Sequence, residues 1–289
     1  MSGVLAAVDL GSATSAVLQS SEVMARALNE PLRVMHVIAD NYLRSAPRRF
    51  KEVWEEDLQN LFDEASKELA RLAEAKLRLL APAADEYLLP HGNPVQAVAA
   101  AAKDSSLLVL AAEGSTPLER VARGGVSRYV MHRGERPVLS VSPDKPLEKI
   151  SRVAVAVDDS SAALAALKVG TRIARAANAK LRAFHLISVG PRSCCVPQYL
   201  PPESLHEADL DSRAEKALRK ALSYEGELTV ARGEEIDGLL DLSREFAADV
   251  IVVGSKAKSS HWTRLGRNVV GLLYASEIPL LVVPEAVGL

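Results

Sequence analysis

The sequence predicts an α/β protein with two similar doubly wound, open parallel-sheet domains. Its 289 residues suit two domains of ordinary size. The two halves of the chain repeat the same motifs in the same order. Within each half, strand-sized apolar runs alternate with helical patterns, and such alternation produces parallel sheets with right-handed crossovers. We therefore expect two copies of one Rossmann-like domain, each beginning and ending on a strand.

The repeat is carried by strands and by the residues that follow them. Asp9 and Asp158 are 149 positions apart, and so are His36 and His185. The matching prolines near the end of each copy are only 142 positions apart, because the second copy is shorter in its middle. The matching segments are VLAAVDLGSATSAV (4–17) and VAVAVDDSSAALAA (153–166), LRVMHVI (32–38) and LRAFHLI (181–187), and RPVLSV (136–141) and IPLLVV (278–283).

The stretch SPDKPLEKIS (142–151) joins the two copies. Two prolines and mixed charge make it a linker in our interpretation, with domains over 1–144 and 150–289. The last strands, around Val138 and Leu280, end the two domains. Because a bare apolar edge invites pairing, we expect these final strands to join the domains as a pseudo-dimer. A homo-oligomer is a further option.

Helical patterns fill the segments between the strands. The first helix is expected over 12–29, with Ser12 as its N-cap. A longer helix is expected over 48–80, and its shorter counterpart in the second copy over 203–222. The apolar residues of the longer helix recur at helical spacing, which predicts an amphipathic helix with Trp54 in the core. They are Phe50, Trp54, Leu58, Leu61, Ala65, Leu69 and Leu72.

Composition and charge exclude several classes of partner. Hydrophobic residues make up 48% and charged residues 25%, as in ordinary soluble globular proteins. The net charge of −2 offers no basic surface for nucleic acid or for an anionic membrane. The apolar runs are much shorter than the roughly 20 residues that a membrane helix needs. We expect neither nucleic acid nor a membrane as partner.

Both the N-terminus and the cysteines favour a cytoplasmic protein. The opening MSGVLAAVDLGS has no basic region before its apolar run, so we interpret it as a first strand rather than a signal peptide. The only cysteines are the adjacent Cys194 and Cys195, which exclude a disulfide framework. Adjacent cysteines can hardly form the usual zinc chelate, even with His206 nearby, so no metal site is expected.

Glycines follow the apolar run at 107–111. Gly114 lies in the loop, and Gly124 and Gly125 precede a helix expected from Val126. Open α/β sheets bind ligands outside the carboxyl ends of their strands, and free amides at a helix N-terminus hold phosphate. The glycines therefore suit a nucleotide cradle, although two ordinary turns would also explain them. The chain has no P-loop, no G-x-G-x-x-G after its first strand and no G-x-S-x-G elbow.

Taken together, these features resemble the universal stress protein family in its tandem two-domain form. The resemblance covers nearly the whole chain, and it implies an adenine nucleotide alpha hydrolase-like fold that binds ATP or AMP, alone or with Mg²⁺. The residues and motifs that carry it are Asp9 and Asp158, His36-Val37 and His185-Leu186, HGNPVQAV (91–98), the terminal strands PVLSV and PLLVV, and the glycine loop.

Nucleotide-binding members of this family carry G-x-x-G, nine residues, then G-[S/T]. The first copy keeps this spacing, with alanine in place of the first glycine and glycine in place of the hydroxyl residue. Ser127 could supply the missing hydroxyl. By this resemblance Asp9 and Val37 contact the adenine and ribose. The remaining residues of the motif, which would hold the phosphates, are Ala111, Gly114, Gly124, Gly125, Val126 and Ser127.

The second copy departs further from the family motif. Ala257 replaces the second glycine, the spacer is eight residues long, and Arg267 stands where serine or threonine is expected. The arginine could block the cradle or pair with a phosphate, so the site is either lost or modified. Ser255, Lys256, Lys258 and Ser259 keep the loop polar and cationic. The residues of this degenerate site would be Asp158, Leu186, Gly254, Ser255, Gly266 and Arg267.

The aspartates and histidines at the strand ends also have structural interpretations. Asp9 and Asp158 could form turns directly after their strands, a role compatible with ligand contact. His36 and His185 lie beside apolar residues. Since the sequence places no nucleophile or second base near them, we expect hydrogen-bonded, partly buried histidines rather than catalytic ones.

These features favour a binding protein over an enzyme. The sequence shows no clear water-positioning residue and no dedicated metal carboxylate, so any ATP hydrolysis would be slow. We expect a regulatory protein that binds an adenine nucleotide, foremost in the first domain. The alternatives are a nucleotide-free stress protein acting through protein contacts, a slow nucleotide hydrolase, and a pocket for an apolar ligand between the domains.

Overall fold

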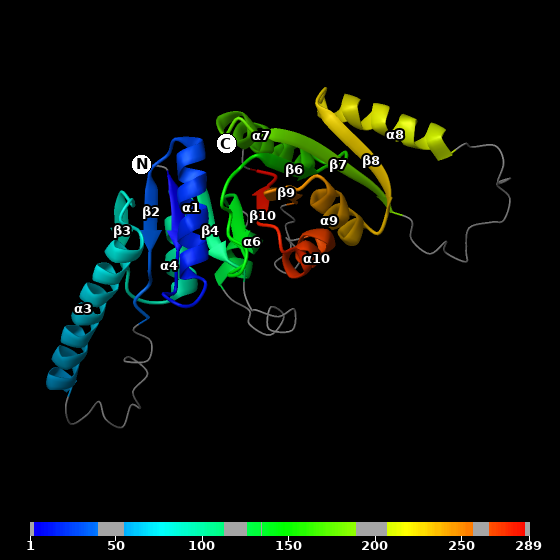
Figure 1. Ribbon diagram of the computed structural model, residues 1–289. Coiled ribbons are helices and arrows are strands. Elements are labelled where there is room, and N and C mark those ends of the chain that lie inside the picture. Colours follow the sequence, from blue (N-terminus) through cyan, green and yellow to red (C-terminus); the bar gives the residue numbers. More distant parts are fainter. Residues whose placement is uncertain are drawn as a thin grey trace. The chain divides into compact units, whose positions relative to one another are not determined.

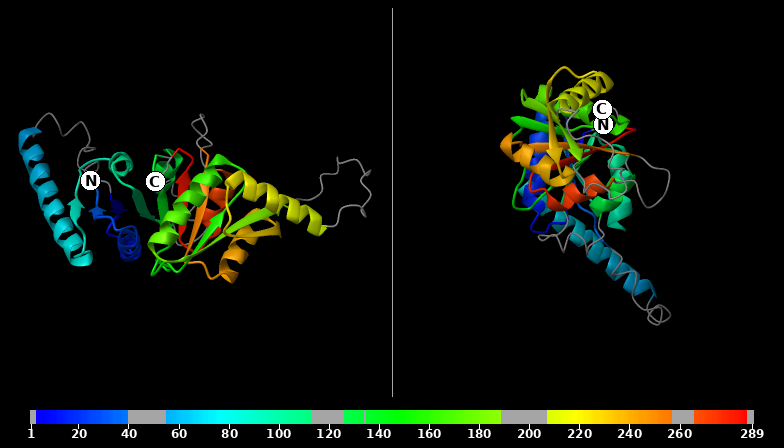
Figure 2. Two further views of the ribbon diagram at one scale, coloured as in Figure 1. Left: turned by 90° about the horizontal axis from the view of Figure 1, so that it is seen from above. Right: turned by 90° about the vertical axis from the view of Figure 1, so that its right-hand side faces the viewer.

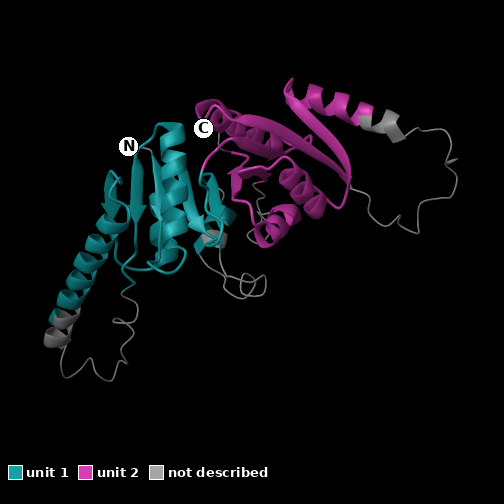
Figure 3. Ribbon diagram, viewed as in Figure 1, with its two compact units in different colours: residues 1–148 teal, residues 149–289 magenta. Residues whose placement is uncertain are grey.

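The computed structural model describes residues 3–39, 55–112, 126–133, 135–188, 207–256 and 266–286. The chain divides into two compact units, Met1–Glu148 and Lys149–Leu289 (Figure 3). This division agrees with two domains in tandem, while the finer boundaries at 144 and 150 stay predictions.

Strands and helices alternate along unit 1 (Figure 1). Its strands pair in the order β3-β2-β1-β4-β5, and every pair is parallel. The chain therefore leaves β1 on one side for β2 and later returns to its other side for β4, which makes a switch point between β1 and β4. The elements are β1 (Val4–Ala7), α1 (Thr14–Leu28), β2 (Leu32–Met35), α3 (Glu55–Leu80), β3 (Glu86–Leu88), α4 (Pro94–Lys103), β4 (Leu107–Ala111), α6 (Val126–Arg133) and β5 (Val138–Val141).

Unit 2 repeats this topology. Its strands pair in the order β10-β9-β6-β7-β8, again all parallel, so the switch point falls between β6 and β9. The elements are β6 (Arg152–Ala156), α7 (Ser161–Ala176), β7 (Lys180–Ser188), α8 (Glu207–Leu222), β8 (Glu227–Gly233), α9 (Glu235–Glu245), β9 (Val250–Ser255), α10 (Arg267–Ala275) and β10 (Leu280–Pro284).

The central strands are apolar along their whole length because helices cover the sheet. In unit 2, α7 packs on β6, β9 and β10 (Figure 2). Helix α9 packs on β7 and β8, α10 packs on β9 and β10, and the two helices contact each other. Val250, Ile251 and Val252 of β9 are fully buried. In unit 1, α1 packs on β1 and β4, whose residues Val4, Leu5 and Leu108 are fully buried as well. This burial confirms the doubly wound class predicted from continuous apolar runs.

The same ion pair joins the second and third strands of each unit. Arg33 on β2 contacts Glu86 on β3 at 2.8 Å, and Arg182 on β7 contacts Glu227 on β8 at 2.8 Å. In both units the arginine and glutamate are direct partners in the strand register. The repeat therefore extends to the cross-strand pairs.

The first helix begins later than expected, and Ser12 is not its N-cap. Helix α1 begins at Thr14, and its N-cap residue Ala13 makes no side-chain capping bond to any described residue. In α7 the N-cap is Ser160, whose Oγ accepts a hydrogen bond from the Ala163 amide at 3.2 Å. The position equivalent to Ser160 in the first copy is Gly11, which has no hydroxyl, so this cap is lost there.

The described side chains of the predicted apolar stripe of the long helix α3 are exposed. Leu69 and Leu72 are 51% and 54% exposed, and Leu79 is 80% exposed. The helix is anchored instead by Ala73 and Leu77, which are buried. A helical spacing of leucines predicts an apolar face but not what covers it. Phe50 and Trp54, which also belong to the predicted stripe, lie outside the described residues, as do the side chains of Leu58 and Leu61.

Among the helices of the described ranges, none is both long and apolar enough to cross a membrane.

Candidate functional site

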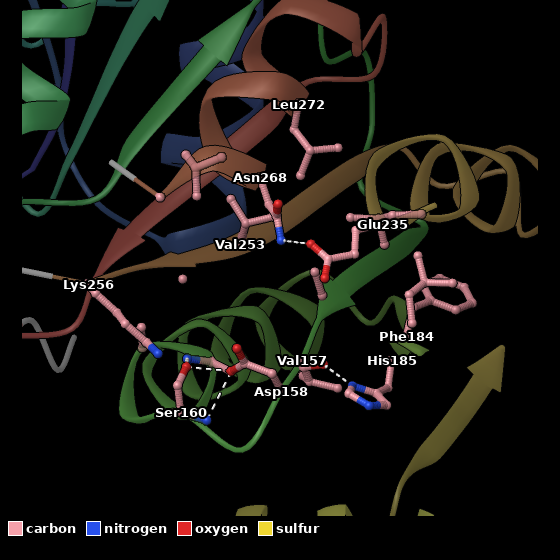
Figure 4. A pocket seen from close by; sticks show the side chains of 18 of the residues that line it. Val157, Asp158, Ser160, Phe184, His185, Glu235, Val253, Lys256, Asn268 and Leu272 are labelled. Carbon is pink, nitrogen blue, oxygen red and sulfur yellow. Dashed lines mark hydrogen bonds between the residues drawn. The ribbon is translucent and has the colours of Figure 1, made fainter. Parts of the chain in front are cut away.

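A cavity of about 570 Å³ opens at the carboxyl ends of β6 and β9, at the switch point of unit 2 (Figure 4). Its volume lies within the roughly 300–1,000 Å³ typical of small-molecule sites. Strand ends and helix N-termini form its wall. The lining residues are Ala156, Val157, Asp158, Ser160, Ala162, Ala163, Phe184, His185, Leu186, Glu235, Leu239, Val253, Gly254, Lys256, Gly266, Arg267, Asn268, Val269 and Leu272.

Asp158 enters this wall through a tight turn after β6. Its Oδ1 accepts hydrogen bonds from the Ser160 amide, at 2.9 Å, and from the Ser160 hydroxyl (Figure 4). In unit 1 the Asp9 Oδ1 accepts the Gly11 amide at 2.8 Å. Both aspartates thus form Asx turns, which confirms the turn-forming interpretation. Their contact with a ligand stays a prediction, and the exposed side chains leave room for it.

The two histidines hold neighbouring strand ends together. His185 Nδ1 lies 2.8 Å from the Val157 carbonyl oxygen, and His36 Nδ1 lies 2.9 Å from that of Val8. Because a carbonyl oxygen only accepts, Nδ1 carries the proton and donates in both rings. Each side chain is partly buried and hydrogen-bonded, as expected. His185 also lines the cavity, where the neutral ring presents Nε2 as an acceptor.

Gly254 and Gly266 have different surroundings. A Cβ on Gly254 would collide with the Ala162 carbonyl and approach the Ala163 nitrogen to 2.8 Å. This glycine therefore lets β9 pass close to the first turn of α7. A Cβ on Gly266 would meet no described atom within 4 Å, and the residue has an ordinary φ of −60°. The described structure does not need a glycine there, so the open space suits close approach of a ligand.

Charged side chains lie around the cavity, and one of them, Glu235, is hydrogen-bonded to a neutral side chain. Lys256 follows β9, and Arg267 is the first residue of α10, where it is exposed. The next residue, Asn268, donates from Nδ2 to Oε2 of Glu235, the first residue of α9 (Figure 4). With Asp158, the wall carries two carboxylates and two cations.

The structure brings together most of the residues predicted for the second site. Asp158, Leu186, Gly254, Gly266 and Arg267 all line the cavity, whereas Ser255 is buried in β9 and does not.

Sequence reasoning missed Glu235 and Asn268. Asn268 directly follows Arg267, and Glu235 begins the helix after the third strand of the second copy. Both positions lie at the predicted ligand edge, and this placement could have indicated them. Ala257, Lys258 and Ser259 lie outside the described residues.

In unit 1 the described part of the predicted site lies at the equivalent edge. Asp9 follows β1, Val37 follows β2 and is buried, and Ala111 ends β4. Val126 begins α6, and Ser127 comes next in the same helix. Because β1 pairs with both β2 and β4, these strand ends are neighbours. Three predicted phosphate-binding residues lie outside the described residues, namely Gly114, Gly124 and Gly125.

Within the ranges that the structure describes, no group of three or more His, Cys, Asp and Glu side chains could hold a metal ion. Cys194, Cys195 and His206 lie outside those ranges.

The fold and the switch-point cavity define a doubly wound, Rossmann-like α/β protein with a duplicated domain. The model of the universal stress protein family matches residues 1–142 and 149–284. The chain therefore belongs to the universal stress protein family and carries its domain twice, in tandem. No curated protein matches the sequence.

Solved structures agree with this assignment. A universal stress protein from Archaeoglobus fulgidus matches with a TM-score of 0.71 and 19% identity, covering 98% of each chain. A Pseudomonas aeruginosa protein assigned to the same family matches with a TM-score of 0.61 and 14% identity, over 98% of this chain and 92% of its own. These identities are low, so the likeness establishes the fold. A universal stress protein in complex with cAMP covers 47% of this chain at 25% identity, with a TM-score of 0.32.

Proposed function

We propose that this chain is a regulatory binding protein for an adenine nucleotide, ATP or AMP, in the stress response. The observation that carries the proposal is the cavity at the switch point of unit 2. Its wall contains residues at five positions that correspond to the family's nucleotide site. A cavity of about 570 Å³ in this place is of the size and position expected for such a ligand.

Different parts of the cavity would hold different parts of the nucleotide. Phe184, Val253 and Leu272 offer apolar surface for a base. The Asp158 carboxylate, fixed by its Asx turn, can accept a hydrogen bond from a ribose hydroxyl or an adenine amine. The N-terminus of α10, with Gly266 and Arg267, offers free amides and a cation to an anion.

We propose a corresponding nucleotide site in the first domain, which keeps the spacing of the family motif. Asp9 and Val37 would contact the adenine and ribose. Mg²⁺, where it takes part, would accompany the nucleotide on its phosphate oxygens. The residues proposed around the phosphates are Ala111, Gly114, Gly124, Gly125, Val126 and Ser127.

Binding would act by shifting the population of conformations rather than by catalysis. Among the described residues of the wall, the Ser160 hydroxyl is bonded to Asp158 within the turn, and His185 uses Nδ1 to hold a strand end. Pairing of the domains through their final strands, and any homo-oligomer, stay predictions, as does a cytoplasmic location.

The direct test uses protein purified without added nucleotide. The protein is denatured, and its supernatant is separated by anion exchange. We expect ATP, ADP or AMP at about one per chain if a single domain binds tightly, and about two if Arg267 is tolerated in the second. An empty supernatant, followed by no calorimetric heat with ATP and Mg²⁺, would contradict the proposal. It would favour the alternative of a nucleotide-free protein acting through protein contacts.

A further inference from the structure

One feature of the unit 2 cavity has no place in the family motif. Glu235 and Asn268 belong to different helices, α9 and α10, and their side chains meet in the wall of the cavity (Figure 4). The amide of Asn268 donates to the carboxylate of Glu235. The pair therefore holds a negative charge in the first turn of α10, where the motif would place a phosphate.

The first copy has neither of these side chains. Gly92 and Gly233 both have positive φ and both lie just before the helix that follows the third strand. Counted from these glycines, the position of Glu235 is occupied by Pro94 in unit 1. Counted from the matching prolines, which are 142 positions apart, the position of Asn268 is occupied by Val126. The carboxylate and its amide partner are thus particular to the second copy.

A carboxylate in this place changes which ligands the cavity can accept. The N-terminus of a helix carries partial positive charge and free amides, and it binds an anion whether the anion is a phosphate or a carboxylate. Glu235 places a carboxylate beside this end of α10, where it accepts a hydrogen bond from the Asn268 side chain. A phosphate arriving at α10 would meet a like charge held in place by a hydrogen bond, and like charges at close range are costly.

The charges around the cavity agree with this effect. Asp158 and Glu235 offset Lys256 and Arg267, so the described wall has no excess of positive charge. A nucleoside triphosphate brings several negative charges to this wall, whose described charges balance. A nucleoside brings none and still offers its base to the apolar wall and its ribose hydroxyls to the Asp158 carboxylate.

We propose that the second domain takes a purine nucleoside of the adenosine type in preference to ATP, and that Glu235 determines this preference. The inference rests on the proposed function and refines it. The two domains would then divide one ligand class between them, with polyphosphate bound by the first and the uncharged nucleoside bound by the second.

The test labels the full-length protein with 2-azidoadenosine under ultraviolet light. Labelled peptides are then assigned to unit 1 or unit 2 by mass spectrometry. Adenosine and ATP compete separately with the probe. On unit 2 peptides we expect adenosine to compete at a concentration at least about tenfold lower than ATP, because the carboxylate repels the phosphates. In the variant Glu235→Gln, ATP should compete with the probe at about the same concentration as adenosine does. The concentration at which adenosine competes should change by less than about twofold.

The matched control is Glu234→Gln. Glu234 is the exposed residue directly before Glu235, it does not line the cavity, and its side chain makes no capping bond to any residue that the structure describes. Its variant removes the same charge from the chain, so the ratio between ATP and adenosine should stay as in the wild type. Glu235→Pro, which introduces the residue of the first copy, serves as a second variant and should act as Glu235→Gln does.

The outcomes separate this inference from the proposed function. Equal competition by ATP and adenosine in the wild type would overturn the inference, as would a change in Glu234→Gln as large as that in Glu235→Gln. In both cases labelling of unit 2 would persist and the proposed function would stand. If the probe labels neither unit and ATP releases no calorimetric heat, both the inference and the proposed function are wrong.

Discussion

Units 1 and 2 share one scaffold but differ where a ligand would touch it. Both have the same strand order, the same Asx turn after the first strand and the same histidine bond between strand ends. They differ at helix starts and strand ends around the predicted site, where Gly11, Pro94 and Ala111 of unit 1 correspond to Ser160, Glu235 and Gly254 of unit 2. Positions that hold the sheet together are thus repeated, and positions around the ligand edge have diverged.

The positions that the two units share show which motif residues have a structural role in addition to any contact with a ligand. The Asp9 and Asp158 carboxylates and the two histidine rings each satisfy a backbone group at a strand end. Removing one of them would therefore disturb the fold and the site together. The positions that differ between the copies are better places to separate binding from stability.

The largest effect is expected from Leu77, which anchors α3, the longest of the described helices. Leu77→Ala removes a fully buried side chain and should lower the free energy of unfolding of unit 1 by about 2–5 kcal/mol. Leu79→Ala, at an 80% exposed position two residues on, should change it by less than about 0.5 kcal/mol. The measurement is amide hydrogen exchange in increasing urea, with the peptides of each unit followed separately. Equal effects of the two substitutions would mean that α3 is covered on its other face in solution.

The next effect concerns Gly254, near the carboxyl end of β9 in unit 2. Gly254→Ala should destabilise that unit by about 1–3 kcal/mol, because the new methyl group meets the Ala162 backbone at the start of α7. In the first copy the same position is Ala111, so the close approach belongs to unit 2. Gly266→Ala is the control. Its methyl group meets no described atom, so stability should stay within about 0.5 kcal/mol while nucleoside affinity falls. A stable Gly254→Ala protein would show that α7 can shift away.

A smaller effect is expected from the capping difference between α7 and α1. Ser160→Ala should cost about 1 kcal/mol of unfolding free energy in unit 2, because the Ala163 amide loses its acceptor. Ser160→Gly, which introduces the residue of the first copy, should cost only a few tenths of a kcal/mol. Urea unfolding of both variants, resolved by unit, provides the comparison. If the two substitutions cost the same, the serine would act through its bond to Asp158 rather than through the cap.

The smallest effect is expected from the repeated ion pairs. A double-mutant cycle on Arg33 and Glu86 should give a coupling energy of up to about 1 kcal/mol, and one on Arg182 and Glu227 a smaller value within the same range. The reason is solvent screening, since the Arg33 side chain is 14% exposed and that of Arg182 is 38% exposed. Both couplings should fall in 1 M salt. A coupling of Arg182 that exceeds that of Arg33 would contradict this order.

The sequence by itself determined the fold class and the repeat of this protein. Continuous apolar runs, their alternation with helical spacing and the return of Asp and His at 149 positions are local patterns. They report which segments are buried on both faces and in which order they occur. The family assignment and the doubly wound topology follow from such patterns and are confirmed. Local patterns misled where they depended on a neighbour, as with Ser12, whose expected cap is absent, and with Leu69 and Leu72, which nothing described covers.

Only the tertiary structure decided which side chains meet at the carboxyl edge of the sheet. Glu235 and Asn268 are far apart in the sequence and belong to different helices, and each by itself is an ordinary polar residue at a helix start. Their contact exists because α9 and α10 pack side by side. The reason for Gly254 likewise lies in another element, the first turn of α7. Periodicity encodes which face of an element is buried, but the distance between two elements is set by how all their side chains pack.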